Sequence, residues 1–244
     1  MTHNKYDPAI IVALDVPDSI AALELTSQLD PHLCRVKVGM ELFDAAGPRL
    51  IEDLHEEGFN VFLDLKLKDI PNTVASTAQV LCDLGVWAFN LHTDGGSKML
   101  LATMETIRQA RHRPHIIGVT VLTSMDYLDL REVGVPTPKK STLPHVIKLA
   151  TLAKKSGLNG VVCSGEEASE VRRRFGKDFI IMTPGIRLPD GNKDDQKRIV
   201  TPEIAIQNGA DYLVVGRPIT RALHISAALA DFDERVRLAR ADLT

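Results

Sequence analysis

The segment from Asp64 to Asp69, with the sequence DLKLKD, places two carboxylates and two lysines within six residues. Because side chains alternate along a strand, Asp64 and Lys66 are expected on one face, and Leu63 and Leu65 on the other. Opposite charges held this close can create a fixed electrostatic field around a bound molecule. The same spacing would also occur in a solvated cluster of ion pairs on a loop, so the segment alone does not establish a site.

Lys37 strengthens the interpretation of this segment as a site. It lies between Val36 and Val38 in a short apolar run, so its side chain is expected on the face opposite the two valines. Unpaired charges would be costly to desolvate there, whereas lysines and aspartates of alternating sign hold each other ionised and in place. Lys37 is therefore predicted to join the charged residues of the segment in one array of alternating charges.

Other reactive side chains also stand at or near the carboxyl ends of predicted strands. They are Asp15, His92, Thr123, Arg187 and Arg217. For any one of them, a polar residue where a strand meets solvent is the ordinary explanation. If the strands are parallel, however, their carboxyl ends open on one edge, and all of these side chains are expected to converge on one mouth.

The elements that must position these residues are eight short apolar runs, each followed by a longer segment of helical periodicity. The predicted strands are 10–15, 35–39, 60–66, 86–92, 116–123, 160–164, 179–183 and 212–216, and helices are predicted at 19–29, 73–84, 142–156 and 219–240, among others. Strict alternation implies a parallel sheet, and eight units favour a closed barrel. An open doubly wound sheet fits less well, because no GxGxxG follows the first strand. The predicted fold class is α/β, a (β/α)₈ barrel.

The two longest connections, 124–141 and 184–200, follow the fifth and seventh predicted strands. Connections of this length without obvious structure are uncommon in compact domains unless they have a function. Both leave the carboxyl ends of strands, where barrel enzymes place their sites. Neither is a Gly/Ser linker, so residues 1–244 are expected to form a single domain.

The composition argues against several classes of protein. The 29 Lys and Arg nearly balance the 32 Asp and Glu, and no basic run is interleaved with aromatic residues, so no nucleic acid partner is expected. The three cysteines form no CxxC pattern and the eight histidines show no ligand spacing, so we expect neither disulfides nor a bound metal. No apolar stretch is long enough to span a bilayer. A cytoplasmic location fits these features best.

Six short motifs follow the predicted strands in order. They are KVG at 37–39, DLKLKDIPNT at 64–73, NLH at 90–92, VLT at 121–123, TPGIR at 183–187 and VVGRPIT at 214–220. In sequence, order and spacing they resemble the bacterial orotidine 5′-phosphate decarboxylases over nearly the whole chain. The match is specific, because each motif stands at the end of its own predicted strand.

The resemblance implies a homodimeric enzyme that converts orotidine 5′-monophosphate to uridine 5′-monophosphate, the last step of de novo synthesis of that nucleotide, without a cofactor. It implies a charged tetrad of Lys37, Asp64, Lys66 and Asp69 of the partner subunit, with Lys66 as the proton donor to C6. The implied substrate-binding positions also include Asp15 at the ribose, Thr123 at the pyrimidine, Ile70 and Thr73 where the site spans the dimer, and Arg187, Gln196, Gly216 and Arg217 at the 5′-phosphate.

The phosphate assignment also has a basis in the residues that follow the eighth predicted strand. Gly216 would let an anion approach the backbone closely, Arg217 offers a forked donor, and a helix opened by Pro218 would point its positive end toward the anion. A glycine close to a proline also commonly marks a simple turn. The position at a strand end favours phosphate binding.

Two other functions fit parts of the sequence. A metal-dependent sugar-phosphate decarboxylase or aldolase of the same barrel group would share the DxKxxD spacing, but it would carry an acidic residue in place of Lys37, where a lysine repels magnesium. A non-catalytic barrel that binds a phosphorylated ligand would need Arg217 but neither Lys66 nor Asp69. Retention of the complete charged set favours the decarboxylase.

Overall fold

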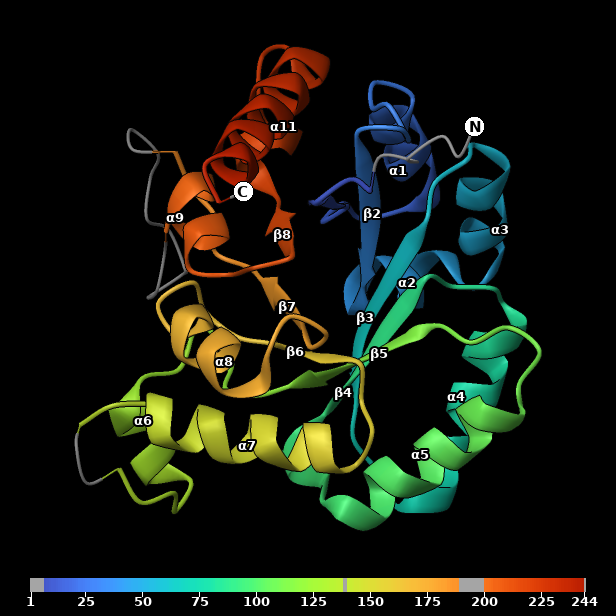
Figure 1. The fold of residues 1–244 in the computed structure, drawn as a ribbon. Coiled ribbons are helices and arrows are strands. Elements are labelled where there is room, and N and C mark those ends of the chain that lie inside the picture. Colours follow the sequence, from blue (N-terminus) through green and yellow to red (C-terminus); the bar gives the residue numbers. More distant parts are fainter. Residues whose placement is uncertain (1–6, 138–139, 189–199, 244) are drawn as a thin grey trace, which may run out of the picture.

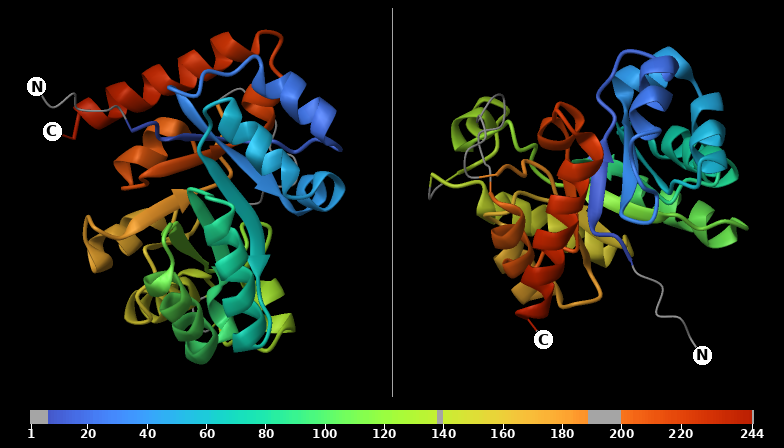
Figure 2. Two further views of the ribbon diagram at one scale, coloured as in Figure 1. Left: turned by 90° about the vertical axis from the view of Figure 1, so that its right-hand side faces the viewer. Right: turned by 90° about the horizontal axis from the view of Figure 1, so that it is seen from above.

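The computed structural model describes residues 7–137, 140–188 and 200–243. Eight parallel strands pair in sequence order, and β8 returns to β1, so the sheet closes into a barrel (Figures 1 and 2). The strands are β1 (Ile10–Ala13), β2 (Cys34–Gly39), β3 (Val61–Leu67), β4 (Ala88–His92), β5 (His115–Val119), β6 (Gly160–Val162), β7 (Ile180–Thr183) and β8 (Tyr212–Val215). The predicted (β/α)₈ fold class is confirmed.

Helices follow the strands and cover the outside of the barrel. They are α1 (Ser19–Thr26), α2 (Met40–Ala46), α3 (Arg49–Glu56), α4 (Pro71–Asp83), α5 (Ser97–Gln109), α6 (Tyr127–Glu132), α7 (Leu143–Lys155), α8 (Ala168–Phe175), α9 (Pro202–Gln207), α10 (Arg217–Thr220) and α11 (Ile225–Ala241), with a short 3₁₀ turn η1 at Thr93–Gly95. Neighbouring helices pack side by side, as α4 does with α5 and α9 with α11 (Figure 1).

Local sequence signals set where several of these helices begin and end. Asp18 caps α1 by accepting a hydrogen bond from the backbone N–H of Ala21 at 2.9 Å, and Thr201 accepts from Ile204 at the start of α9. After α4 and α7 the chain passes through Gly85 and Gly157, which adopt positive φ angles of 72° and 88°. Glycine takes this conformation without steric cost, so both helices stop where the sequence predicts.

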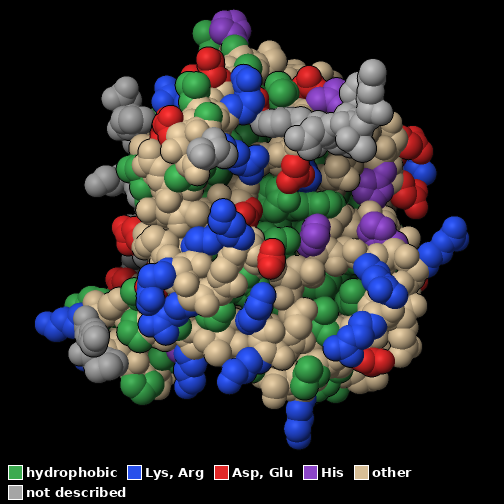
Figure 3. Space-filling view, viewed as in Figure 1, with side chains coloured by type: hydrophobic (Ala, Val, Ile, Leu, Met, Phe, Trp, Pro, Cys, Tyr) green, Lys and Arg blue, Asp and Glu red, His purple; other side chains and the backbone are tan. Residues whose placement is uncertain are grey.

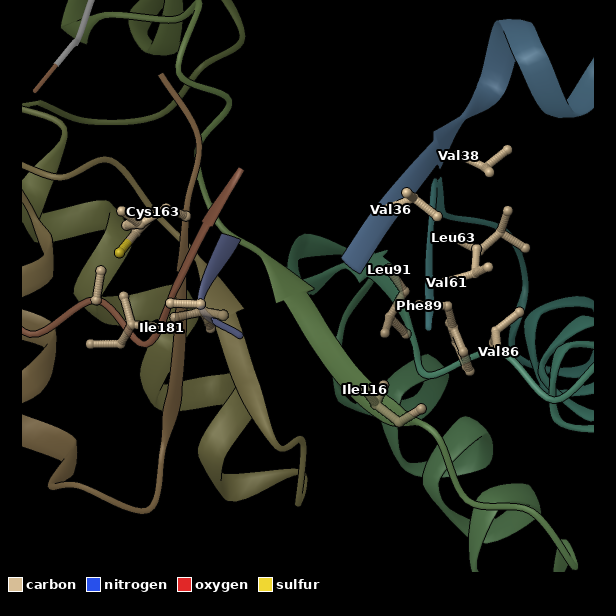
Figure 4. Packing of buried hydrophobic residues seen from close by; sticks show 14 of the residues in the cluster. Val36, Val38, Val61, Leu63, Val86, Phe89, Leu91, Ile116, Cys163 and Ile181 are labelled. Carbon is tan, nitrogen blue, oxygen red and sulfur yellow. The ribbon is translucent and has the colours of Figure 1, made fainter. Parts of the chain in front are cut away.

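Alternating side chains divide the apolar residues of the barrel into two layers. Outward-facing residues such as Val36, Val38 and Leu63 pack with the helices in one large core (Figure 4). Inward-facing residues fill the barrel itself, and they are Ile11, Phe62, Ala88, Ile117, Met182 and Tyr212. Six of the eight strands contribute to this inner layer, whereas the inward-facing side chains of β2 are the charged Arg35 and Lys37.

An arginine between two aromatic rings fills the amino-terminal end of the barrel. The guanidinium carbon of Arg35, at the start of β2, lies 4.2 Å from the ring centre of Trp87 and 5.0 Å from that of Tyr212. Arg35 pairs with Asp7, whose second carboxylate oxygen accepts a hydrogen bond from the Tyr212 hydroxyl at 2.9 Å. Cation–π contacts and this ion pair offset the cost of burying the arginine.

The structure corrects two expectations about the segments around the barrel mouth. The helix predicted at 219–240 is two helices, α10 and α11, separated at residues 221–224. A single straight helix would not fit, because α10 contacts β1 at the barrel mouth whereas α11 packs on α9 in the outer layer. The connection at 124–141 is not structureless: it holds α6, which begins with a capping box formed by Asp126 and Asp129.

The predicted strand at 116–123 is also shorter than expected. Strand β5 ends at Val119, and the residues that follow leave the ladder. Val121, Leu122 and Thr123 instead line a cavity at the mouth. The sequence run is continuous and apolar, so its composition does not show where the ladder ends.

Close packing between β6 and β7 yields a stability prediction. A Cβ atom on Gly160 would overlap the backbone carbonyl of Ile180, its register partner on β7. Because that backbone is held in the sheet, Gly160→Ala should lower the free energy of unfolding by about 1–3 kcal/mol. Denaturant unfolding at a fixed protein concentration measures the change.

Gly95→Ala is the matched control for this substitution. A Cβ atom there would also overlap a neighbour, but that neighbour is the flexible end of the Met99 side chain, which can rotate away. Both substitutions change the entropy of the unfolded chain alike, so their difference isolates the rigid backbone contact. Equal losses of stability in the two variants would contradict the explanation.

Candidate active site

A cavity of about 400 Å³ opens at the carboxyl ends of the strands. Strands β1 to β6 and β8, and the segment after β7, all contribute to its lining. The lining residues are Ala13, Asp15, Lys37, Phe62, Asp64, Lys66, Asn90, Val119, Val121, Leu122, Thr123, Val162, Pro184, Gly185, Arg187, Val214, Gly216, Arg217, Thr220 and Arg221. The space-filling view shows the other, amino-terminal end of the barrel, where hydrophobic side chains near the centre lie among acidic, basic and histidine side chains (Figure 3).

Four of the predicted side chains form a chain of alternating charge in the cavity. Lys37 Nζ lies 3.1 Å from Asp15 Oδ1 and 3.4 Å from Asp64 Oδ2. Lys66 Nζ lies 2.8 Å from the other carboxylate oxygen of Asp64. The side chains of Lys37 and Asp64 are only 11% and 13% exposed. Asp64 therefore stands between two ammonium groups with little access to water.

The pKa of Lys37 reflects two opposing effects in this array, burial and the nearby carboxylates. Burial alone would lower the pKa of the ammonium, because it disfavours the charged form. The carboxylates of Asp64 and Asp15 more than offset this effect, and the net pKa is raised. Lys37 is thus a permanent positive charge at neutral pH.

Strand β3 reaches the cavity through an irregular backbone. Leu63 pairs with Phe89 of β4 and Leu67 pairs with Leu91, so three residues of β3 stand opposite one residue of β4. Within this bulge Lys66 has a φ of 53°, in the left-handed region. A residue with a Cβ atom costs about 1–2 kcal/mol there. The alternation expected for Asp64 and Lys66 does place both in the cavity, but the strand between them is not regular.

Asn90 is the residue of β4 opposite this bulge, and no role is predicted for it from the sequence. It is buried and lines the cavity. Its side-chain amide donates to Asp64 Oδ1 at 2.6 Å and accepts from the backbone N–H of Lys66 at 2.8 Å. A signal was present in the sequence, since an amide in the middle of an apolar strand needs partners to be buried.

Arginines line the side of the cavity opposite the lysine array. Arg187 follows β7, and Arg217 and Arg221 follow β8, whereas Lys66 and Asp64 lie on β3. In a closed barrel of eight strands β3 stands across from β7. The cavity therefore has one cationic wall of arginines, and it faces an array in which the ammonium groups of Lys37 and Lys66 are balanced by Asp15 and Asp64.

Gly216 lies between these arginines and the first strand. A Cβ atom there would meet the Asp15 carboxylate at 3.6 Å, an ordinary van der Waals distance. The neighbouring side chains thus leave room for a Cβ atom at this position. A glycine here leaves that room to a molecule that approaches the backbone in the cavity.

Not all of the site residues predicted from the sequence line the cavity of this chain. The cavity lining includes Asp15, Lys37, Asp64, Lys66, Thr123, Arg187, Gly216 and Arg217. Asp69, Ile70 and Thr73 are exposed and outside this lining, and Gln196 lies outside the described residues. The fourth member of the expected tetrad is thus not in the cavity of its own chain.

The histidine at the end of β4, the cysteines and the possible metal ligands of the described residues show no feature of a second reactive site. Burial lowers the pKa of His92, and Asp94 offsets this only in part, so the imidazole is neutral near pH 7. The cysteines are buried and form no disulfide, and burial raises the pKa of Cys34 to about 12. Within the described ranges, no three His, Cys, Asp or Glu side chains are arranged to hold a metal ion. In the same part of the chain, no helix is long and apolar enough to cross a bilayer.

Comparison with known proteins gives consistent matches over almost the whole sequence. Residues 8–232 match the family described as Orotidine 5'-phosphate decarboxylase / HUMPS. The chain is 53% identical over 232 residues to the orotidine 5′-phosphate decarboxylase of Nitrosomonas eutropha, covering 94% of this chain and 97% of that protein. It is 46% identical over 228 residues to the decarboxylase of Vibrio cholerae, covering 93% and 97%.

Solved structures give the same result. The crystal structure of orotidine 5′-phosphate decarboxylase from Lactobacillus acidophilus superposes with a TM-score of 0.83 at 38% identity, covering 94% of this chain and 99% of that one. An uncharacterized conserved protein from Geobacillus kaustophilus superposes with a TM-score of 0.80 at 37% identity, covering 93% and 99%. In sequence and fold, this chain belongs to the orotidine 5′-phosphate decarboxylase / HUMPS family.

Proposed function

We propose that this chain decarboxylates orotidine 5′-monophosphate to uridine 5′-monophosphate and carbon dioxide, without a cofactor. Its relatives at 46–53% identity carry the name of that activity. The observation that carries the proposal is the ammonium group of Lys66, held at 2.8 Å by a nearly buried carboxylate in a cavity with arginines on the facing wall. A nucleotide could place its phosphate at the arginines and its base at Lys66.

The chemistry requires a positioned charge. When the bond between C6 and the carboxyl group breaks, carbon dioxide leaves and an electron pair stays in an sp² orbital that the ring cannot delocalise. The Lys66 ammonium stabilises this pair and then transfers its proton to C6, after which the neutral amine regains a proton from water. At about 4 Å and an effective dielectric constant of about 20, one such charge pair contributes about 4 kcal/mol. Enzymes typically lower barriers by about 8–23 kcal/mol, so further contacts must contribute.

The remaining cavity residues supply those contacts. We assign Asp15 and Lys37 to the ribose hydroxyls and Thr123 to the pyrimidine edge. Arg217 and the backbone at Gly216 are assigned to the 5′-phosphate, with Arg187 beside them, and the family resemblance adds Gln196. Binding energy at the phosphate can then be used to place C6 against Lys66.

We further propose that two copies of the chain complete each site. Asp69, Ile70 and Thr73 are exposed at the start of α4, where a second chain could reach them, and Ile70 is 67% exposed. In a twofold dimer, Asp69 of the partner subunit would extend the charged array beyond Lys66, and the partner's Ile70 and Thr73 would lie beside it. The array would then alternate in sign over five side chains, from Asp15 to the partner's Asp69.

Replacement of Lys66 tests the proposed chemistry. Lys66→Ala should slow the decarboxylation of orotidine 5′-monophosphate by at least about 10²-fold, because the group assigned as the proton donor to C6 is lost. Affinity for uridine 5′-monophosphate should change little, since most binding contacts lie elsewhere. Loss of the orotate ultraviolet band, followed after exhaustive chelation of metals, measures turnover.

Lys68→Ala is the matched control in the same segment. Its ammonium is paired with Asp94 at 2.8 Å and lies outside the cavity. Turnover close to that of the unaltered chain is expected. A fully active Lys66→Ala variant would refute the proton-donor role, and recovery of activity only with magnesium would indicate the sugar-phosphate enzymes instead.

Replacement of Arg217 tests the phosphate assignment. Arg217→Ala should reduce kcat/KM for the nucleotide by roughly 10–100-fold, because an ion-paired hydrogen bond to the phosphate is lost. Turnover of orotidine, which has no phosphate, should change little. If both substrates lose activity equally, Arg217 does not act through the phosphate.

Subunit mixing tests the shared site. Lys66→Ala and Asp69→Asn, each nearly inactive alone, are unfolded together in equal amounts and refolded. Half of the dimers should be mixed, and one of their two sites should pair an intact Lys66 with an intact Asp69, so about one quarter of the unaltered activity should return. If Asp69 acted within its own chain, every site would keep a lesion, and heterodimers would form without recovery.

A further inference from the structure

The bulge in β3 leaves a gap in the sheet next to the central lysine. Between the pairs Leu63–Phe89 and Leu67–Leu91, Asn90 alone stands opposite three residues of β3. The backbone N–H of Lys66 bonds to the Asn90 side chain at 2.8 Å instead of to a backbone carbonyl of β4. The Asn90 amide therefore accepts the hydrogen bond that a backbone carbonyl of β4 would otherwise accept. The donor is Lys66, the residue of this strand with a positive φ angle.

The same amide also holds the partner of the Lys66 ammonium. Its nitrogen donates to Asp64 Oδ1 at 2.6 Å, and Lys66 Nζ approaches the same oxygen at 2.8 Å. The result is a closed ring: the backbone of Lys66 bonds to Asn90, Asn90 to Asp64, and Asp64 to the end of the Lys66 side chain. Asn90 thus contacts the backbone of Lys66 directly and its ammonium group through Asp64.

The chemistry of the two contacts explains why an asparagine suits the position. The N–H of Lys66 needs an acceptor and the carboxylate of Asp64 needs a donor, which fixes the orientation of the amide. A leucine would leave the N–H of Lys66 without this acceptor and would remove one of the donors to Asp64. An aspartate could accept from the N–H but would set a second negative charge against Asp64.

We propose that Asn90 is the positioning residue for the Lys66 ammonium. It holds the left-handed backbone of Lys66 and the carboxylate orientation of Asp64 together, so that Nζ is fixed before the substrate arrives. The inference rests on the proposed decarboxylation. Asn90 itself moves no proton, and it acts through Lys66 and Asp64.

Three variants separate positioning from ordinary structural support. Asn90→Ala removes both contacts, and Asn90→Asp keeps an acceptor for the Lys66 N–H but loses the donor to Asp64. Asn159→Ala is the matched control, because Asn159 also accepts from a strand N–H, that of Ile116 at 2.8 Å, at the opposite end of the barrel. Measured for each are kcat with orotidine 5′-monophosphate, the Kd for uridine 5′-monophosphate and the Tm.

Asn90→Ala should lower kcat by roughly 10–100-fold, the effect of losing a hydrogen bond to a charged group. The Kd for uridine 5′-monophosphate should stay within about threefold, because contacts to the ribose and phosphate remain. Asn90→Asp should be at least as slow. Asn159→Ala should lose Tm without losing kcat.

Unchanged kcat in Asn90→Ala would overturn the inference, and so would a fall in kcat matched by an equal loss of affinity for uridine 5′-monophosphate. If Asn90→Ala failed to fold, Asn90→Asp would decide, since it is isosteric and keeps the backbone contact. An unaltered chain that did not decarboxylate the nucleotide would overturn the proposed function instead. Crystal structures of the Asn90 variants would then still show whether Lys66 leaves the left-handed conformation.

Discussion

The carboxylate of Asp64 is the interaction on which the cavity depends. It is almost enclosed, and it touches Lys37 through one oxygen and Lys66 through the other. A buried carboxylate with one partner removed is strongly destabilising, and so is a buried ammonium, so the three charges are stable only as a set. The raised pKa of Lys37 expresses the same dependence. Any molecule that binds here meets a field that was fixed during folding, which is the condition for electrostatic catalysis.

The barrel provides the surroundings in which such a field remains strong. Apolar side chains fill the interior below the charges, and the cluster around Arg35 fills the amino-terminal end. The charged groups that line the cavity are thus separated from this cluster by the apolar interior. Because parallel strands all end on this edge, side chains far apart in the sequence meet within one cavity. The same fold then allows the lysine wall and the arginine wall to face each other.

The left-handed conformation of Lys66 lies where the regular pairing of β3 with β4 is interrupted, at the edge of the cavity. A regular ladder would pair β3 with β4 residue for residue, but the bulge inserts extra backbone and turns Lys66 into the left-handed region. Such conformations persist only where the surroundings hold them, and the amide of Asn90 makes the two bonds that do so. Natural sequences commonly depart from local rules at functional sites. Here the irregular residue, Lys66, lies on β3, and Asn90, which stabilises its conformation, lies on the adjacent strand β4.

The repeating order of strands and helices, the eight units that favour closure and the inward direction of Lys37 and Asp64 could all be predicted from the sequence. The order and the inward directions follow from apolar periodicity and local capping, which are properties of neighbouring residues, and closure follows from the number of units. Tertiary structure alone decided that β5 ends at Val119, that α10 and α11 are separate, that Lys66 is left-handed and that Asn90 joins it to Asp64. Each of these depends on which strand or helix lies alongside, and such partners are distant in sequence. The period of two places a residue on a face of the sheet, but only the packed barrel determines which atoms meet there.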